Sequence, residues 1–215
     1  KQLGVTLIDI GGGTTDIIIY NNKSVIHTAA IPLGGESLTN DIALGLTVTL
    51  NQAEKLKCEH GLAKESLASK EDEIVIKGVN GREDSKVSQK SLCSIIEARM
   101  KEIFYLAKNE IKKIENECNL NFGVVVTGGG SKLKNIKDLA TEVFELDIQQ
   151  GIPNSINGID DIINNPRYAT TIGLVKYINE NKDKDLRMIK NDEDLELLEI
   201  FKKYYKKIIK KLKLK

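Results

Sequence analysis

The chain has 215 residues, of which 40 % are hydrophobic and 29 % are charged, and its formal net charge is +1. These values are typical of a soluble globular protein with a sizeable core. The sequence contains no run near the roughly 18 apolar residues of a membrane-spanning helix, no secretory signal and no CxxC pair for a disulfide or a thiolate zinc site, which points to a reducing cytoplasm.

The first sixty residues are predicted to form three strands and then two helices. Short apolar runs indicate the strands, and Pro32 with the pair Gly34-Gly35 ends the strand pattern. The strands are expected over 5–10, 16–20 and 25–31, with a hairpin turn at 21–23, and the helices over about 37–46 and 51–59.

The rest of the body combines one long helix with shorter elements. Apolar residues at a three-to-four spacing predict the long helix over about 88–117. The shorter elements are expected as strands over 73–79, 122–126 and about 147–149, a turn at 80–81, a helix capped by Ser131 that reaches about 144, and a helix over about 168–178. Residues 179–194 are rich in Asn, Lys, Asp and Glu, which indicates a solvated linker.

A first motif follows the first strand. It reads Asp9-Ile10-Gly11-Gly12-Gly13-Thr14-Thr15-Asp16. Glycines turn sharply and let main-chain N–H groups approach phosphate oxygens. Asp9 and Asp16 can hold a hydrated Mg²⁺, and the Thr14 and Thr15 hydroxyls can reach a γ-phosphate or an attacking water. A purely structural turn is the alternative for this motif taken alone.

A second glycine turn follows the strand that ends near Val126. It reads Thr127-Gly128-Gly129-Gly130-Ser131, and its backbone can lie against a sugar, a base or an α-phosphate. The N-terminus of the helix expected next would add partial positive charge. Two glycine turns, each directly after an apolar strand and about 115 residues apart, are more specific than either alone. They form neither a Walker A loop nor a Rossmann fingerprint.

The two turns resemble motifs of one superfamily. DIGGGTTD at 9–16 resembles the phosphate-2 motif of actin, the Hsp70 chaperones and the sugar kinases, and VVVTGGGSKLKNI at 124–136 resembles their adenosine motif. PLGGE at 32–36, AEKLK at 53–57, EAR at 97–99 and PRYA at 166–169 are similar to the bacterial cell-division family FtsA. The resemblance covers residues 3–178 almost continuously.

The resemblance implies an α/β fold, the second domain of an actin-like ATPase. An RNase H-like subdomain is expected at 1–60 and 120–178, a smaller α/β partner-binding subdomain at 61–119, and a C-terminal amphipathic helix at 195–215. The implied cofactors are ATP and Mg²⁺, with Asp9 and Asp16 holding the metal through water. The implied nucleotide contacts are Asp9, Gly11, Gly12, Gly13, Thr14, Thr15, Gly35, Glu54, Lys57, Gly128, Gly129, Gly130 and Lys132. For Glu54 and Lys57, a solvated helical ion pair is the alternative.

The family resemblance also implies a function. Such a protein binds ATP with at most slow hydrolysis, polymerises head to tail, and tethers filaments of the tubulin-like FtsZ to the cytoplasmic face of the membrane at the division site. Arg99, Asn109 and Lys112 are candidate contacts for the C-terminal peptide of FtsZ, with a solvated helix face as the alternative. The alternative proteins are an actin-like pilus-assembly adaptor and a sugar or acyl kinase.

The match begins at the phosphate-2 motif, whereas an actin-like protein carries another phosphate loop on its N-terminal half. This chain is therefore expected to be the C-terminal half, to hold one wall of the nucleotide cleft, and to bind ATP weakly or not at all when isolated.

The end of the chain is strongly basic. Residues 201–215 carry eight lysines and no acidic residue, whereas the remainder has 24 basic against 31 acidic residues and a net charge of −7. From Leu195, lysines lie opposite an apolar helical stripe, a pattern that favours docking on an anionic membrane, where each lysine contributes about 1 kcal/mol. The candidate membrane residues are Leu198, Phe201, Lys202, Tyr205, Lys206, Ile208, Ile209 and Leu212. A partner helix is an alternative, and nucleic acid is not expected because the tail lacks arginine.

Overall fold

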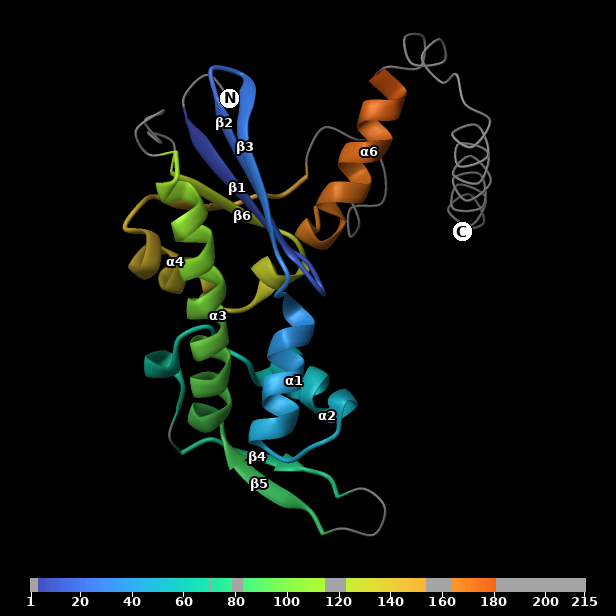
Figure 1. Ribbon diagram of the computed structural model, residues 1–215. Coiled ribbons are helices and arrows are strands. Elements are labelled where there is room, and N and C mark those ends of the chain that lie inside the picture. Colours follow the sequence, from blue (N-terminus) through green and yellow to red (C-terminus); the bar gives the residue numbers. More distant parts are fainter. Residues whose placement is uncertain (1–3, 70, 79–82, 115–122, 154–163, 181–215) are drawn as a thin grey trace, which may run out of the picture. The chain divides into compact units, whose positions relative to one another are not determined.

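The computed structural model describes residues 4–69, 71–78, 83–114, 123–153 and 164–180. The chain divides into two units between Ile172 and Gly173, and each is described by itself. The first unit holds the sheets and most of the helices (Figure 1). Of the second unit only 173–180 are described, as part of α6 (Ala169–Glu180).

A five-stranded mixed sheet forms one end of the first unit (Figure 1). Its strands lie in the order β3-β2-β1-β6-β7 and are β1 (Val5–Ile10), β2 (Thr15–Asn21), β3 (Ser24–Ile31), β6 (Val124–Thr127) and β7 (Ile148–Gln150). β1 pairs antiparallel with β2 and parallel with β6. Alternate residues of β1 are buried, as expected for a strand with one face on the core.

The β2–β3 hairpin confirms the predicted turn at 21–23. Asn21 pairs with Ser24, so the loop between them has two residues. Both of these, Asn22 and Lys23, have positive φ, at 48° and 69°. Two positive φ values match the right-handed twist of the flanking strands, which explains why the chain reverses here without a longer loop.

The long helix α3 (Gln89–Lys112) runs beside the sheet and continues beyond it (Figure 1). The side chain of Ser88 caps its start by accepting a hydrogen bond from the Ser91 N–H. One face of α3 is fully buried, and Phe104 meets Phe144 of α4 (Ile136–Phe144) edge to face at 5.4 Å. The helix predicted over about 88–117 is thus confirmed as far as Lys112, and 115–117 lie outside the described residues.

Beyond the sheet, α3 packs with a second group of elements (Figure 1). These are α1 (Gly35–Gly45), α2 (Leu50–His60), the short helix η1 (Glu65–Leu67), and the hairpin of β4 (Glu73–Ile76) and β5 (Ser85–Ser88). The strand expected over 73–79 ends at Ile76, and the turn expected at 80–81 lies outside the described residues. β5 was not predicted, because Val87 is its only apolar residue.

The prediction that Ser131 caps a helix is wrong. Ser131 lies inside the short helix η2 (Gly129–Lys132), it is buried, and its hydroxyl donates to the Gly128 carbonyl at 2.8 Å. α4 begins only at Ile136, after Asn135 with a positive φ of 61°. No α-helix therefore starts at the second glycine turn, and the partial positive charge expected there from a helix N-terminus is absent from this part of the structure.

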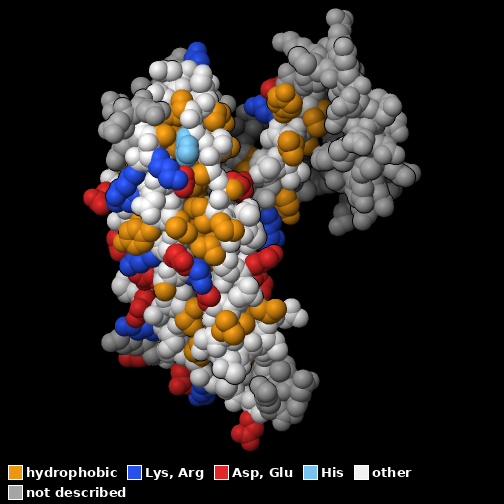
Figure 2. Space-filling view, in the orientation of Figure 1, with side chains coloured by type: hydrophobic (Ala, Val, Ile, Leu, Met, Phe, Trp, Pro, Cys, Tyr) orange, Lys and Arg blue, Asp and Glu red, His pale blue; other side chains and the backbone are white. Residues whose placement is uncertain are grey.

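Ion pairs fasten α3 to its neighbours at the surface. Arg99 donates two hydrogen bonds to Asp41 of α1, at 2.5 and 3.0 Å. Glu142 of α4 accepts both Lys64, at 2.9 Å, and Lys101, at 3.2 Å. Figure 2 shows acidic and basic side chains interspersed over this face. Because such half-exposed pairs contribute little each, they fix orientation while the buried face supplies most of the stability.

No helix in the described ranges is both long and apolar enough to cross a membrane. The first two residues of the linker predicted over 179–194, Asn179 and Glu180, belong to α6, and its remainder, with the tail at 195–215, lies outside the described residues. The division into an RNase H-like subdomain and a smaller subdomain at 61–119 stays a prediction.

Replacing Phe104 with Ala is expected to lower the free energy of unfolding by about 3–5 kcal/mol, because the fully buried ring leaves a cavity. Its neighbour on α3, Tyr105, is 54 % exposed, and Tyr105→Ala should change stability by less than about 0.5 kcal/mol. Urea unfolding followed by circular dichroism measures both variants. Equal losses would contradict the burial of Phe104.

Candidate functional site

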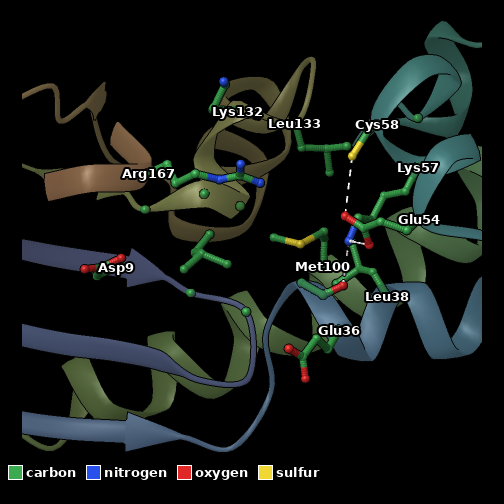
Figure 3. A pocket seen from close by; sticks show the side chains of 18 of the residues that line it. Asp9, Glu36, Leu38, Glu54, Lys57, Cys58, Met100, Lys132, Leu133 and Arg167 are labelled. Carbon is green, nitrogen blue, oxygen red and sulfur yellow. Dashed lines mark hydrogen bonds and ion pairs between the residues drawn. The ribbon is translucent and has the colours of Figure 1, made fainter. Parts of the chain in front are cut away.

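A cavity of about 830 Å³ opens in the first unit, where the ends of β1 and β6 meet α1 and α2. Its volume lies in the range of small-molecule sites. Figure 3 shows Asp9 on one side, Glu54, Lys57 and Cys58 on the other, and Arg167 and Lys132 between them. Its glycines are Gly11, Gly12, Gly35, Gly61, Gly128, Gly129 and Gly130, and its acidic residues are Asp9, Asp16, Glu36 and Glu54.

The start of α1 is hydrogen-bonded to the backbone of the first glycine turn. The N–H of Gly35 donates to the Gly11 carbonyl at 2.9 Å, and the N–H of Glu36 donates to the Gly12 carbonyl at 2.8 Å. A Cβ on Gly34 would lie 2.5 Å from the Gly12 carbonyl oxygen, so only glycine fits there. The turn and the helix are thus one rigid assembly.

Two carboxylates face each other beside this turn. Asp9 and Asp16 are direct partners in the β1–β2 ladder, and both line the cavity. Like charges directly opposite each other in a sheet destabilise it, and a cation shared by the two would relieve that repulsion. The described residues contain no group of three or more His, Cys, Asp and Glu side chains that could hold a metal ion by themselves. A pair of carboxylates completed by water and phosphate oxygens is what Mg²⁺ accepts, so the donor set fits that ion.

The second glycine turn packs directly on the end of β1. Gly128 has a φ of +84°, and a Cβ on it would collide with Asp9 Oδ1 and lie 2.5 Å from the Ile10 carbonyl oxygen. Gln150 supports the turn from β7, since its side-chain amide donates to the Ser131 carbonyl at 2.8 Å. The absence of a side chain at Gly128 therefore allows the two turns to share one cavity.

A polar cluster joins α1 to α2 at the far side of the cavity. The Lys57 ammonium donates to the Gly35 carbonyl at 2.8 Å, to the Thr39 hydroxyl at 2.8 Å and to Glu54 Oε2 at 2.6 Å. These three bonds use all three ammonium donors. Thr39 also donates to Glu54 at 2.5 Å. Lys57 thus connects α2 to α1, while Glu54 is half exposed toward the cavity.

The same cluster shifts the pKa values of two acidic groups, Glu54 and Cys58. Burial acts to raise the pKa of Glu54, but the hydrogen bonds from Lys57 and Thr39 prevail and hold that pKa below its ordinary value. Burial, followed by the Glu54 charge, raises the pKa of the Cys58 thiol. The cavity therefore presents an ionised carboxylate beside a neutral thiol at neutral pH.

Most of the nucleotide-contact residues expected from the sequence line this cavity. Three of them do not: Gly13 and Thr14 lie exposed at the tip of the turn, and Thr15 is buried. The Thr14 hydroxyl donates to Asp16 at 3.2 Å, and that of Thr15 donates to the Leu33 carbonyl at 2.8 Å. Both hydroxyls thus serve the turn itself.

Sequence reasoning missed five polar residues of the cavity: Glu36, Cys58, Lys134, Arg167 and Thr170. Cys58 had a usable signal, since it lies four residues after Glu54 on one helix face. Arg167 also had a usable signal, because it belongs to the PRYA segment at 166–169 that is similar to the FtsA family. Thr170 had none, because its contact is with a residue 161 positions away.

The candidate partner residues lie apart on α3. Asn109 and Lys112 are exposed and three residues apart, so they are neighbours on the helix surface. Arg99 lies roughly 15 Å along the helix from Asn109. Its guanidinium is engaged by Asp41 and Glu102 within the chain. A partner that used Arg99 would have to compete with these two carboxylates.

Comparison with known proteins gives strong sequence matches. The family model described as "Cell division protein FtsA" matches residues 6–173. The FtsA protein of Pseudomonas aeruginosa is 38 % identical to this chain over 177 residues, and that of Neisseria meningitidis serogroup B is 40 % identical over 177 residues. The FtsA protein of Escherichia coli K12 is 32 % identical to this chain over 188 residues. These matches cover 82 %, 81 % and 84 % of this chain. They cover 42 %, 42 % and 45 % of the relatives, so the chain spans less than half the length of each.

Solved structures share the fold at low identity. MreB 5 of Spiroplasma citri bound to AMPPNP has a TM-score of 0.66 and 19 % identity, over 86 % of this chain and 55 % of that one. The PilM–PilN type IV pilus biogenesis complex has a TM-score of 0.61 and 16 % identity, over 82 % and 46 %. At these identities the likeness establishes an actin-like α/β fold.

Glu54 is expected to make stability depend on pH. A carboxylate with a lowered folded-state pKa adds stability above its ordinary pKa, and this contribution is lost as the pH falls through the lowered value. Wild type should therefore be more stable than Glu54→Gln at pH 7, with the difference disappearing as the pH falls below the lowered pKa of Glu54. Thr39→Val, which removes one donor to Glu54, should lie between them. A difference that does not change with pH in urea unfolding would contradict this role.

Proposed function

The chain belongs to the FtsA family of cell division proteins, and we propose that its cavity binds ATP together with Mg²⁺. The observation that carries the proposal is the meeting of two glycine turns and a facing pair of carboxylates in one cavity of nucleotide size. Exposed glycine backbone suits phosphate oxygens, and carboxylates with water suit the metal. MreB 5, which shares the fold, was solved with AMPPNP bound.

The parts of the nucleotide are assigned by chemistry. The phosphates and the metal lie at Gly11, Gly12 and the pair Asp9–Asp16. The nucleoside lies along Gly128–Gly130, with the half-exposed carboxylate of Glu54 near enough to accept ribose hydroxyls in addition to its bonds from Lys57, Thr39 and Cys58. When bound, Mg²⁺ neutralises phosphate charge, and the protein's part is to orient the ion's water shell through its two carboxylates.

Hydrolysis is proposed to be slow at most. The Thr14 and Thr15 hydroxyls, which were expected near the γ-phosphate or the attacking water, donate to Asp16 and to the Leu33 carbonyl. No catalytic base is assigned in the described part of the chain. A regulatory use of ATP, rather than turnover, fits this arrangement.

Sequence identity to the FtsA family favours a cell-division role over the alternative functions. Identities of 32–40 % to FtsA proteins over more than four fifths of the chain favour a cell-division role. The pilus-assembly likeness is one of fold, at 16 % identity. The same identities to FtsA proteins favour the cell-division role over a sugar or acyl kinase.

We further propose that the tail at 195–215 docks on the anionic cytoplasmic face of the membrane, and that the protein forms filaments and holds FtsZ there. The tail proposal rests on eight lysines opposite an apolar stripe. For FtsZ, Asn109 and Lys112 are the freer candidates, because Arg99 is engaged within the chain.

The nucleotide proposal is tested by calorimetry on the full-length protein with MgATP. Gly128→Ala is expected to weaken binding at least tenfold, since the new methyl group would collide with Asp9. Gly173→Ala is the control, because a Cβ there meets no atom within 4 Å. Wild-type affinity in Gly128→Ala, with an unchanged melting temperature, would contradict the site.

Isolated 1–215 is expected to bind MgATP weakly, and a submicromolar affinity measured by calorimetry would contradict that expectation.

The membrane proposal is tested by co-sedimentation with liposomes. Wild type should pellet with anionic vesicles and lose about 1 kcal/mol of binding for each tail lysine removed. Lys202→Glu with Lys206→Glu should reduce the pelleted fraction, whereas Lys55→Glu with Lys137→Glu makes the same charge change on the exposed body and should not. Unchanged pelleting after deletion of 195–215 would refute the tail's role.

A further inference from the structure

The carboxylate of Asp9 is tied to a helix from the other end of the sequence. The hydroxyl of Thr170, in the first turn of α6, donates to Asp9 Oδ2 at 2.7 Å. The two residues are 161 positions apart, and both line the cavity. This is a charge-assisted hydrogen bond, which is stronger and more directional than one between neutral groups.

The other oxygen of Asp9 is confined as well. Oδ1 lies so close to Gly128 that a Cβ there would collide with it. The carboxylate is therefore held between the second glycine turn and Thr170. By contrast, Asp16 accepts a hydroxyl from its neighbour Thr14 at 3.2 Å, within the same turn. Of the two carboxylates that face each other, Asp9 is the one oriented by distant parts of the fold.

The donor is itself fixed in place. The chain enters α6 through the short helix η3 (Pro166–Tyr168), in which Pro166 is buried. The side chain of Asn165 accepts a hydrogen bond from the Arg167 N–H at 3.1 Å, and its carbonyl accepts one from the Tyr168 N–H at 3.0 Å. These contacts set where the first turn of α6 begins, and hence where the Thr170 hydroxyl lies.

We propose that Thr170 is a positioning residue that orients the Asp9 carboxylate toward the hydrated Mg²⁺ of the bound nucleotide. The inference rests on the proposed nucleotide site and adds to it a residue that acts through Asp9. Donation to Oδ2 uses one lone pair and leaves the other acceptor positions of the carboxylate for metal-bound water. Groups that orient a metal's carboxylates in this way commonly change metal affinity by about 10–100-fold when removed.

Reciprocity gives the contact a second consequence. If Thr170 improves the binding of the metal–nucleotide at Asp9, then that ligand strengthens the attachment of Thr170 by the same factor. The first turn of α6, residues 169–172, should therefore exchange its amide hydrogens more slowly when MgATP is bound. Val, which keeps the shape of Thr but lacks the donor, should abolish this coupling, and Ser should keep it.

The test measures binding of a fluorescent ATP analogue to the full-length protein over a Mg²⁺ titration and in EDTA. Thr170→Val is expected to raise the half-saturating Mg²⁺ concentration about tenfold and to leave the affinity in EDTA unchanged. Thr170→Ser should restore the wild-type Mg²⁺ dependence. Thr171→Val is the matched control, because Thr171 is the next residue on α6 and is also exposed. Amide exchange at 169–172 is measured with and without MgATP in the same variants.

The outcomes separate this inference from the function on which it rests. Wild type that binds no nucleotide, with or without Mg²⁺, would overturn the proposed function and this inference together. Wild type that binds with a Mg²⁺ dependence shared by Thr170→Val would overturn this inference alone. An equal effect of Thr171→Val, or an equal loss of affinity in EDTA, would also overturn it, since the role would then be general to the helix.

Discussion

The parallel pairing of β1 with β6 is the constraint on which the rest of this site depends. In that register Asp9 lies opposite Thr127, so the two strands end together at the same edge of the sheet. Each strand is followed by its glycine turn. The turns, more than a hundred residues apart in sequence, become neighbours because carboxyl ends of adjacent parallel strands coincide. β2 then returns beside β1 and places Asp16 opposite Asp9.

Helices complete the cavity by attaching to backbone groups of the turns. The N–H groups of Gly35 and Glu36, at the start of α1, donate to carbonyls of the first turn. Lys57 of α2 donates to the Gly35 carbonyl and so ties the second helix to the same point. Most of these bonds end on main-chain atoms, so their geometry depends on the fold more than on side-chain identity. The Glu54 carboxylate, which these contacts orient, stays half exposed toward the cavity.

Local signals in the sequence were enough for much of this architecture. Apolar runs that stop at glycines marked β1 and β6, and the three-to-four spacing marked α3. β5 could not be found, because a strand with Val87 as its only apolar residue is recognisable only through its pairing with Ile74. The helix start at Ser131 was predicted wrongly because serine is a frequent N-cap, whereas here its hydroxyl closes back on Gly128. Contacts such as Thr170 with Asp9 leave no local pattern at all.

The site residues differ in how far their role can be separated from folding. Gly128 lies against both Asp9 and Ile10, so any side chain there disturbs the junction of two strands as well as the cavity. Lys57 is equally involved, since two of its three hydrogen bonds hold α1 to α2. A loss of ligand binding after changing either residue therefore mixes stability with chemistry. Thr170 is exposed, and within the described part of the chain its hydroxyl makes one hydrogen bond, to the Asp9 carboxylate. Because little else depends on that hydroxyl, Thr170 is the residue through which the orientation of Asp9 can be changed while the fold around it stays intact.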